Sequence, residues 1–327
     1  MVIAVDAAGG DFFPKNPVQG AVEAISEKSN LHVLLVGDEE EIRKELSGYS
    51  ADESRIHILH ATETIGMEES PSAAVKNKRQ SSIVLGLGAQ KEGKCQAFVS
   101  AGNTGALLAA SVFILGKLEG VQRPTIAAAF PTLKGFRLLL DAGANLELKA
   151  DTFVQFARMG SIYSSEVLKV KNPRVGLLNV GEESEKGTEL LKEAYKQLSS
   201  LSNFKGNVEG RDIFAANADV FLCDGYLGNV LLKFGESIPS IIRFLIEDTM
   251  KEMKLDQDVR DQVTNVIHKS LHSFNYEHVG GVPFLGVNGI SMVGHGGSTP
   301  VAIKNMILSA AKCVELNVNH KIVASLA

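Results

Sequence analysis

The sequence predicts an α/β protein in which helices cover both faces of a mainly parallel β-sheet, giving three α/β/α layers. Short apolar runs alternate with helical patterns along most of its 327 residues, the order typical of chains that build parallel sheets. Most of these runs are continuously apolar, which indicates strands buried on both faces. We expect a single catalytic domain over residues 1–327, with a helical hairpin inserted at 237–275.

The predicted strands are short and spread along the chain. They are Val2–Val5, His32–Val36, Arg55–Leu59, Ala97–Val99, Thr125–Phe130, Arg137–Leu140, Val175–Leu178, Val220–Leu222 and Ile290–Val293. Three helix starts are also clear, because an N-cap residue precedes a proline suited to the first helical turn. These starts are Asn16-Pro17, Ser70-Pro71 and Thr299-Pro300.

Six turns that directly follow strands combine glycine with small or polar residues. They begin at Asp6, Ser100, Asp141, Asn179, Cys223 and Gly294. In one parallel sheet such turns share the carboxyl edge, where ligands bind. Because packing alone does not require six turns of this kind, the sequence predicts a ligand site at this edge.

The turn Ser100–Gly105 joins a buried strand to a small-residue helix that starts near Thr104. Free backbone N–H groups and the positive end of the helix dipole favour an anion there. Gly102 and Gly105 remove side chains that would hold a ligand away from the backbone. A turn needed only for packing explains this stretch equally well when it is taken alone.

Residues 237–275 carry two apolar stripes with a 3.6-residue period, separated by the polar segment Lys254–Asp258. This pattern predicts a helical hairpin. The hairpin either packs on its own body or pairs with a second copy in a dimer bundle, which is the reading we favour. Its turn offers a membrane only Leu255, and its acidic residues oppose anionic lipid.

Composition excludes several classes of protein. The formal net charge is −5 and no long basic run occurs, so nucleic acid is not an expected partner. Cys95, Cys223 and Cys313 are scattered in apolar surroundings, which favours a reducing cytoplasm over a disulfide framework. The chain opens on a strand pattern rather than a signal peptide, and no apolar run reaches the ~18 residues of a membrane span. Neither a metal nor a cofactor is expected, because no ligand set is apparent.

Seven segments spread over essentially the whole chain carry the most specific signal. They are Val5–Asp11, Ser100–Ala106, Leu140–Asn145, Leu178–Glu183 with Lys186-Gly187, Asn207–Asp212, Cys223–Asn229, and Gly286–Gly289 with Gly294–Gly296. In this order and spacing they resemble one family, the bacterial phosphate acyltransferases of phospholipid synthesis (the PlsX family). One departure is Ala8, where the family usually has methionine, a change expected to alter packing at the first turn more than chemistry.

The resemblance implies that an acyl group passes from acyl-[acyl carrier protein] to inorganic phosphate. The acyl phosphate formed would then supply the acyltransferase that acylates glycerol 3-phosphate. The resemblance also implies a fold similar to isocitrate and isopropylmalate dehydrogenases and to phosphotransacetylases. A homodimer and a peripheral contact with the inner face of the cell membrane are implied as well.

For that reaction a protein must hold phosphate beside a thioester, stabilise an oxyanion and release a thiolate. We expect phosphate to be bound by Ser100, Gly102, Asn103, Thr104, Gly105 and Arg211. The catalytic candidates are His295, Lys186 and Asn229. His295 would donate to the thioester oxygen or protonate the thiol, and its alternative role is a structural hydrogen bond. For Lys186 and Arg211 the alternative is a solvated surface charge.

Polar residues of the remaining turns are candidates for substrate binding. They are Asp6, Asp11, Asn145, Asn179 and Asp224. Carboxylates repel phosphate unless they orient a cation or a backbone turn, so turn formation is the alternative for the aspartates. Cys223 follows an apolar strand with no adjacent histidine, and we expect it in the core.

Other functions fit part of this pattern. A nicotinamide dehydrogenase would share the fold, but the first strand leads into Gly9-Gly10-Asp11 rather than a G-x-G-x-x-G turn. A phosphate acetyltransferase acting on acyl-CoA would use similar chemistry. A non-catalytic scaffold for lipid-synthesis enzymes would use the hairpin as its membrane anchor.

Overall fold

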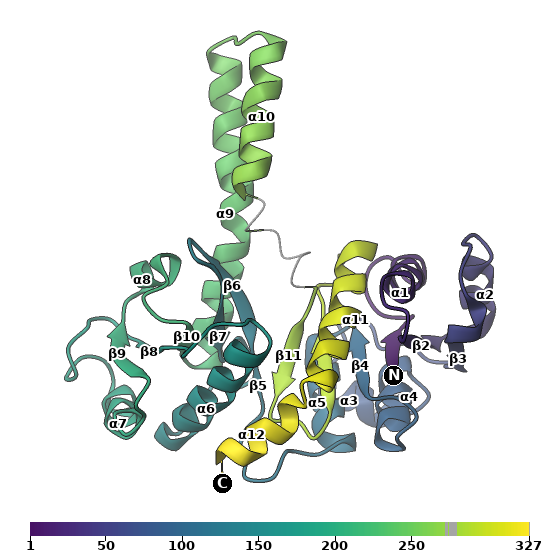
Figure 1. Ribbon diagram of the computed structural model, residues 1–327, viewed down its shortest axis with the longest axis horizontal. Coiled ribbons are helices and arrows are strands. Elements are labelled where there is room, and N and C mark those ends of the chain that lie inside the picture. The colour runs from purple at the N-terminus through teal and green to yellow at the C-terminus, as the bar shows by residue number, and fades with distance from the viewer. Residues whose placement is uncertain (272–273, 275–279, 327) are drawn as a thin grey trace.

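The computed structural model describes residues 1–271, 274 and 280–326, and its strands form two sheets that lie side by side (Figure 1). The first sheet has the order β3 (Ile56–His60), β2 (His32–Gly37), β1 (Val2–Asp6), β4 (Ala97–Ser100), β12 (Ile290–Val293), β11 (Val282–Leu285), β5 (Thr125–Ile126). The second has the order β6 (Ala128–Thr132), β7 (Gly135–Leu140), β10 (Val220–Leu222), β8 (Val175–Leu178), β9 (Phe204–Val208). Most neighbours are parallel, whereas β11 and β6 run antiparallel to their partners. The α/β class with mainly parallel strands is confirmed, but the strands divide between two sheets.

Helices cover both faces of the two sheets. They are α1 (Lys15–Glu27), α2 (Glu39–Leu46), α3 (Pro71–Asn77), α4 (Ser82–Lys91), α5 (Thr104–Ile114), α6 (Ala150–Glu166), α7 (Glu189–Leu198), α8 (Gly210–Ala215), α9 (Gly225–Glu252), α10 (Gln257–Leu271), α11 (Pro300–Glu315) and α12 (Val318–Leu326). A 3-10 turn at Glu53–Arg55 precedes β3. One cluster of buried side chains joins α1, α6, α7, α11 and α12 to the sheets, and a second joins α3, α4, α5 and α8 to them. The result is the predicted three-layer arrangement.

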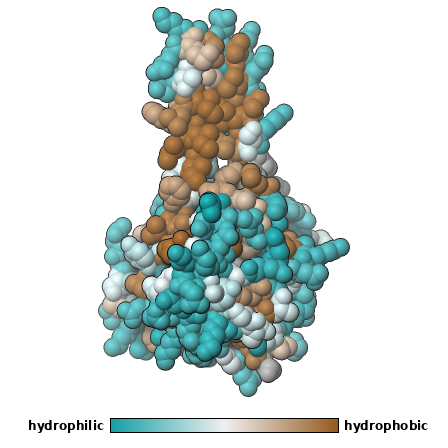
Figure 2. Space-filling view, turned by 90° about the vertical axis from the view of Figure 1, so that its left-hand side faces the viewer, coloured by the Kyte–Doolittle hydropathy of each residue, from teal (hydrophilic) through white to brown (hydrophobic). Residues whose placement is uncertain are grey.

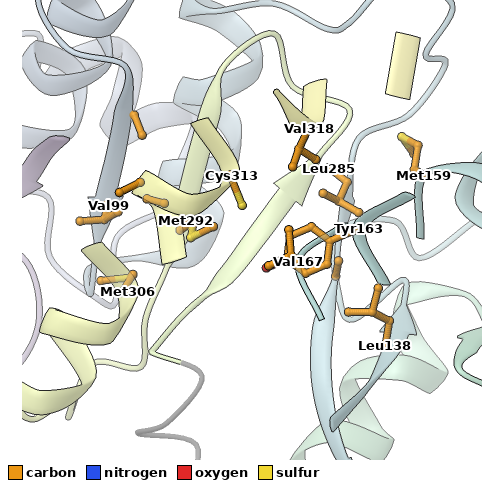
Figure 3. Close-up of a cluster of buried hydrophobic side chains, with 14 of the residues drawn as sticks. Val99, Leu138, Met159, Tyr163, Val167, Leu285, Met292, Met306, Cys313 and Val318 are labelled. Atoms are coloured by element: carbon orange, nitrogen blue, oxygen red, sulfur yellow. The ribbon is translucent and has the colours of Figure 1, made fainter. Parts of the chain in front are cut away.

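Both clusters contain residues of both sheets. In the first, Val99 of β4 and Met292 of β12 belong to the same cluster as Leu138 of β7 and Tyr163 of α6 (Figure 3). Continuous burial of this kind stabilises the position of one sheet against the other, because separating them would expose apolar surface at about 25 cal/mol per Å².

The predicted strand Thr125–Phe130 is divided at Ala127, and its two halves belong to different sheets. Hydrogen bonds hold this crossing in place. The Ile126 N–H donates to Asp141 Oδ1, and the Ala142 N–H donates to the Ile126 carbonyl. The sequence does not indicate this division, because all residues from Thr125 to Phe130 are buried and the run stays apolar on both sides of Ala127.

Two strands are missing from the sequence prediction. β9 contains Lys205 and Gly206 and lies at the edge of the second sheet, where half-exposed residues break the apolar pattern. β11 follows Gly280-Gly281 and contains Pro283. Short strands that carry glycine or proline read as turns in the sequence.

The helix starts are mostly as expected. Pro71 and Pro300 each occupy the first turn of a helix, and the Thr299 side chain accepts from the Ala302 N–H. The expected start at Asn16-Pro17 is wrong, because α1 begins at Lys15. Asn16 does not cap the helix but donates from Nδ2 to the Ser298 carbonyl at 2.9 Å. It therefore ties α1 to the turn that follows β12.

The helical hairpin is longer than predicted. Its first helix, α9, begins at Gly225 rather than near residue 237, and the turn to α10 lies between Glu252 and Gln257. Residues 272, 273 and 275 of the predicted span lie outside the described residues. Figure 1 shows the hairpin standing away from the sheets. In the described ranges, no helix is both long and apolar enough to cross a bilayer.

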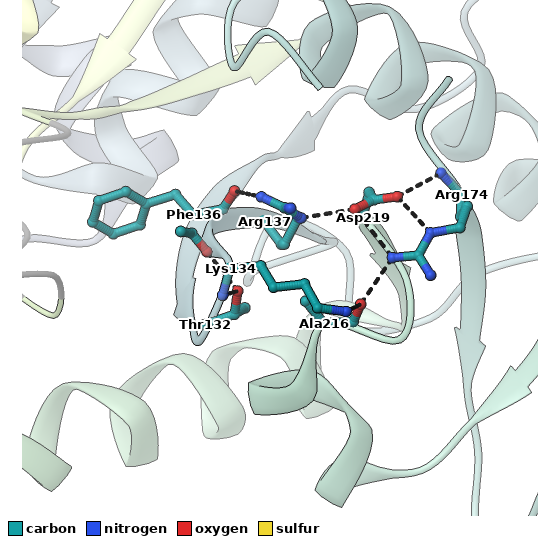
Figure 4. Close-up of polar contacts among 8 residues, drawn as sticks. Thr132, Lys134, Phe136, Arg137, Arg174, Ala216 and Asp219 are labelled. Carbon is teal, nitrogen blue, oxygen red and sulfur yellow. Dashed lines mark hydrogen bonds and ion pairs between the residues drawn. The ribbon is translucent and has the colours of Figure 1, made fainter. Parts of the chain in front are cut away.

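The second sheet is reinforced by a charged network around Asp219, whose side chain is only 6% exposed (Figure 4). Arg137 Nε lies 2.7 Å from Asp219 Oδ1, and Arg174 Nε lies 2.9 Å from Asp219 Oδ2. Burial alone would raise the pKa of Asp219, but the hydrogen bonds and charge of Arg174, aided by the charge of Arg137, hold that pKa below its ordinary value. The network connects β7, the start of β8 and the start of β10.

Candidate functional site

A cavity of about 890 Å³ opens between the carboxyl ends of the two sheets. The turns after β4 and β12 line it from the first sheet, and the turn after β7 and helix α9 line it from the second. The sequence predicts one carboxyl edge of a single sheet, whereas the structure has the carboxyl edges of two sheets on either side of one cavity. Six of the predicted site residues line it: Asp11, Gly102, Thr104, Gly105, Asn229 and His295.

The N-terminus of α5 reaches the cavity with Thr104 and Gly105. Asn103 caps this helix, because its Oδ1 accepts from the Ala106 N–H at 3.0 Å. The Asn103 amide nitrogen donates to three backbone carbonyls of the loop at residues 66–69. Asn103 therefore shapes the turn with its side chain, and the N–H groups of Thr104 and Gly105 are left to face an anion.

Ser100 and Asp6 form a buried pair below this turn. Ser100 Oγ donates to Asp6 Oδ2 at 2.6 Å and accepts from the Gly102 N–H at 2.9 Å. Burial raises the pKa of the Asp6 carboxyl, although the Ser100 hydroxyl partly offsets the shift. Both side chains hold the turn in shape and neither lines the cavity.

His295 projects from the glycine-rich turn after β12. Its Nδ1 accepts from the Gly297 N–H at 3.2 Å. This assigns the proton of the neutral ring to Nε2, so Nε2 is available as a donor. The Asp11 N–H donates to the Gly296 carbonyl at 2.8 Å, which joins the turn after β1 to the same wall of the cavity.

From the second sheet, α9 presents Asn229 at the start of its second turn. Asp224 caps the helix by accepting from the Leu227 N–H at 2.8 Å. Gly228 lies against the backbone of Asp141, where any side chain would collide with the Asp141 carbonyl. This close approach brings Asn229 beside Gly143 on the cavity wall.

Asp141 and Asn145 form the turn on which α9 packs. Asp141 is fully buried and accepts from the backbone N–H groups of Ile126 and Ala144 at 3.1 Å and from Asn145 Nδ2 at 2.9 Å. Burial raises the pKa of its carboxyl. Like Asp6 and Asp224, Asp141 uses its carboxylate to hold a backbone turn. Turn formation, rather than substrate binding, is the alternative role given above for the aspartates.

Three predicted residues lie elsewhere. Asn179 and Lys186 belong to the loop after β8, where Asn179 Nδ2 donates to the Lys186 carbonyl at 3.0 Å. Arg211 follows β9, is exposed and pairs with Glu209 at 2.7 Å. None of the three is among the described residues that line the cavity. β8 and β9 are the two strands of the second sheet farthest from β6.

Cys223 lies in the core, as expected. Its thiol is buried and donates weakly to the Asp141 carbonyl at 3.6 Å. Burial raises its pKa well above the ordinary value, and the charges of Asp141 and Asp224 add to the shift. A thiol of this kind is a poor nucleophile. In the part of the chain that the structure describes, no three His, Cys, Asp or Glu residues gather in a metal-binding group.

The sequence reasoning did not single out three charged residues that line the cavity, which are Glu68, Lys233 and Glu236. Two of them, Lys233 and Glu236, follow Asn229 at i+4 and i+7 along α9, so they lie on the same face of the helix as Asn229. Their helical spacing from Asn229 could have identified Lys233 and Glu236 from the sequence. It did not, because the predicted hairpin begins at residue 237 and so leaves both residues outside a helix.

Comparison with known proteins identifies relatives along nearly the whole chain. A family model described as "Fatty acid synthesis protein" matches residues 1–321. A phosphate acyltransferase from Chlorobaculum parvum is 46% identical over 100% of this chain and 99% of its own. One from Salinibacter ruber is 47% identical over 97% of this chain and 95% of its own.

Among solved structures, similarity is in the fold alone. A phosphotransacetylase from Streptococcus pyogenes matches with a TM-score of 0.63 and 16% identity, over 96% of this chain and 94% of that one. EutD phosphotransacetylase from Staphylococcus aureus matches with a TM-score of 0.60 and 14% identity over the same shares. The whole-length family match and the close relatives together establish that this chain belongs to the PlsX family of phosphate acyltransferases.

Proposed function

We propose that this chain transfers a fatty acyl group from acyl-[acyl carrier protein] to inorganic phosphate, and that both sheets act as one catalytic domain. The family supports phosphate as the acceptor. The observation that carries the proposal is the cavity itself, which combines a helix N-terminus suited to an anion with a large apolar wall. Leu108, Ile126, Leu232, Val282 and Val293 belong to that wall.

The reaction needs position and charge more than an activated side chain. A phosphate oxygen attacks the thioester carbon, so a C–O bond forms while the carbonyl oxygen gains negative charge. The C–S bond then breaks, and the leaving thiolate takes a proton to become the free thiol of the carrier. Phosphate held at the amides of Thr104 and Gly105 would need no general base, since it is already ionised at neutral pH.

His295 and Asn229 are the proposed donors to the reacting carbonyl. His295 Nε2 is available once Nδ1 accepts from Gly297, and Asn229 projects from the opposite wall of the cavity. Donors directed at a developing oxyanion in a partly closed site lower the barrier more than the same donors in water. The roles assigned to Lys186 and Arg211 stay predictions.

The acyl carrier protein as donor, rather than coenzyme A, is the finer part of the proposal. Phosphate-dependent release of thiol is measured with a long-chain acyl carrier protein and with acetyl-CoA as parallel substrates. We expect a higher kcat/KM with the acyl carrier protein. Equal or faster turnover on acetyl-CoA would identify a phosphate acetyltransferase, and no phosphate-dependent release from either would favour a non-catalytic scaffold.

We further propose a homodimer formed through the hairpin. Phe234, Ile241, Phe244 and Leu245 of α9 are all more than half exposed, and they lie along one face of the helix. Figure 2 shows the apolar band that runs along this side of the hairpin. A continuous exposed band of this kind is typical of an interface. Delivery of the product to a glycerol 3-phosphate acyltransferase and a peripheral membrane contact complete the proposal.

A further inference from the structure

The walls of the cavity carry an excess of negative charge. Among the lining residues that the structure describes, three carry carboxylates, namely Asp11, Glu68 and Glu236. Lys233 is the sole lysine or arginine among the described lining residues. A phosphate dianion would enter this cavity against the field of the carboxylates, so it needs compensation from fixed positive charge.

Helix dipoles supply part of that compensation. The N-termini of α5 and α11 both reach the cavity, through Thr104 and Thr299. A helix N-terminus acts as about half an elementary charge. The positive charge of two helix N-termini is smaller than the negative charge of a phosphate dianion and three carboxylates. The remaining compensation must come from a side chain.

Lys233 is positioned to provide it. It lies one helical turn beyond Asn229 on α9, so the two residues line the cavity from the same face of that helix. Lys233 Nζ lies 2.9 Å from Glu236 Oε2, and the two side chains are 56% and 27% exposed. A pair this exposed contributes little to stability. The ammonium of this lining residue is therefore paired with a partner that an incoming dianion can replace at low cost.

We propose that Lys233 is the cation that binds the phosphate nucleophile, and that Glu236 is a positioning residue that holds the ammonium before phosphate arrives. This inference rests on the proposed function for its kinetic readout, but phosphate binding tests it separately. When phosphate enters, the ammonium exchanges a carboxylate for a phosphate oxygen, and the charge of Glu236 opposes that exchange.

The two residues therefore have opposite predicted effects. Lys233→Gln removes a charge-assisted contact and should raise the KM for phosphate by about 10- to 100-fold, with the KM for the acyl carrier protein nearly unchanged. Lys233→Arg keeps the charge and should stay within about tenfold of wild type. Glu236→Gln releases the ammonium and removes a repelling charge, so it should lower the KM for phosphate.

The experiment measures initial thiol release over a range of phosphate concentrations for wild type, the three variants and Lys251→Gln. Lys251 is exposed near the far end of the same helix and serves as the matched loss of charge. Calorimetric titration of each protein with inorganic phosphate alone gives Kd without any acyl donor. Thermal melting confirms that each variant is folded.

A structural role for the pair would move the phosphate KM of Lys233→Gln and Glu236→Gln in the same direction, and that result would overturn the proposal. So would phosphate-dependent turnover that is indifferent to Lys233→Gln. If the wild type releases no thiol from the acyl carrier protein but its affinity for phosphate depends on Lys233, the acyl donor is wrong and this inference stands.

Discussion

Ser100 donates a hydrogen bond of 2.6 Å to Asp6 in the core, so the turns that follow two neighbouring strands are held together by their side chains. The same hydroxyl accepts from the Gly102 N–H, the amide that begins the turn toward α5. The shape of the cavity wall thus depends on a serine that does not itself reach the cavity.

Ser100→Ala should therefore act through structure. It removes one of the donors to the buried Asp6 carboxylate, which keeps the Ala8 N–H, and it leaves the buried Gly102 N–H without its side-chain acceptor, at a cost of about 1–3 kcal/mol. Thermal unfolding should show a lower Tm, and Ser199→Ala, at an exposed helix end, serves as the control. Mass spectrometry of enzyme quenched during turnover should find no acyl group on Ser100. An acyl-Ser100 adduct would contradict the structural role.

His295→Ala should lower kcat by about 10²-fold, the usual loss for one oxyanion donor. His295→Gln retains an N–H donor and should keep part of the activity. The measurement is thiol release at saturating phosphate, with His320→Ala as the control because His320 is exposed on α12. An unchanged kcat in His295→Ala would return this histidine to a structural role.

Gly228→Ala tests the close approach of α9 to the Asp141 turn. The added methyl group collides with the Asp141 carbonyl, so α9 must shift and carry Asn229 with it. We expect both a lower Tm and a lower kcat. Gly88→Ala is the matched control, since a methyl group there meets no atom within 4 Å and should stabilise helix α4 by about 0.5–1 kcal/mol. Normal activity in Gly228→Ala would show that the position of Asn229 is unimportant.

The Asp219 network predicts a stability that depends on pH. The pKa of Asp219 is lower in the folded chain than in the unfolded chain, so the unfolded state binds the proton more tightly at acidic pH. The stabilisation is present above the ordinary pKa of an aspartate, about 3.9, and is lost as the pH falls through the folded value. Urea unfolding of wild type between pH 7 and pH 3 should show this loss.

Asp219→Asn removes the carboxylate while leaving both guanidinium groups partly buried. It should lower the free energy of unfolding at pH 7 by about 3 kcal/mol and should flatten the acidic limb of the pH profile. Asp52→Asn is an informative comparison, because Asp52 pairs with Arg55 at 2.8 Å but is half exposed. If Asp219→Asn still loses stability at acidic pH as the wild type does, that loss comes from other carboxylates.

Ile241→Glu tests the hairpin as a dimer interface. A charge in the centre of the apolar band should shift the protein toward monomer, as measured by sedimentation velocity across a range of concentrations. Phe113→Glu, at an exposed apolar residue outside the hairpin, provides the control. If wild type is monomeric, or if both variants stay dimeric, the hairpin is not the interface.

Local patterns in the sequence explain much of the fold. The continuous apolar runs identified nine strand regions, because strands with helices on both faces cannot alternate with polar residues. The helix starts at Ser70 and Thr299 were found because proline and N-cap residues act within one turn of chain. The two strands that were missed, β9 and β11, contain glycine or proline, whose local signal is that of a turn.

By itself, the sequence determined the fold class, the polar turns and the family, since each depends on residues close together in the chain or on their order along it. Only the tertiary structure decided which turns meet. It placed Thr125–Ile126 in one sheet and Ala128–Thr132 in the other. It left Lys186 in a loop and Arg211 at the start of α8, both outside the cavity, and brought Lys233 to the cavity wall. The physical reason is that pairing between distant strands and the packing of α9 on the Asp141 turn are long-range interactions, which no local pattern of residues encodes.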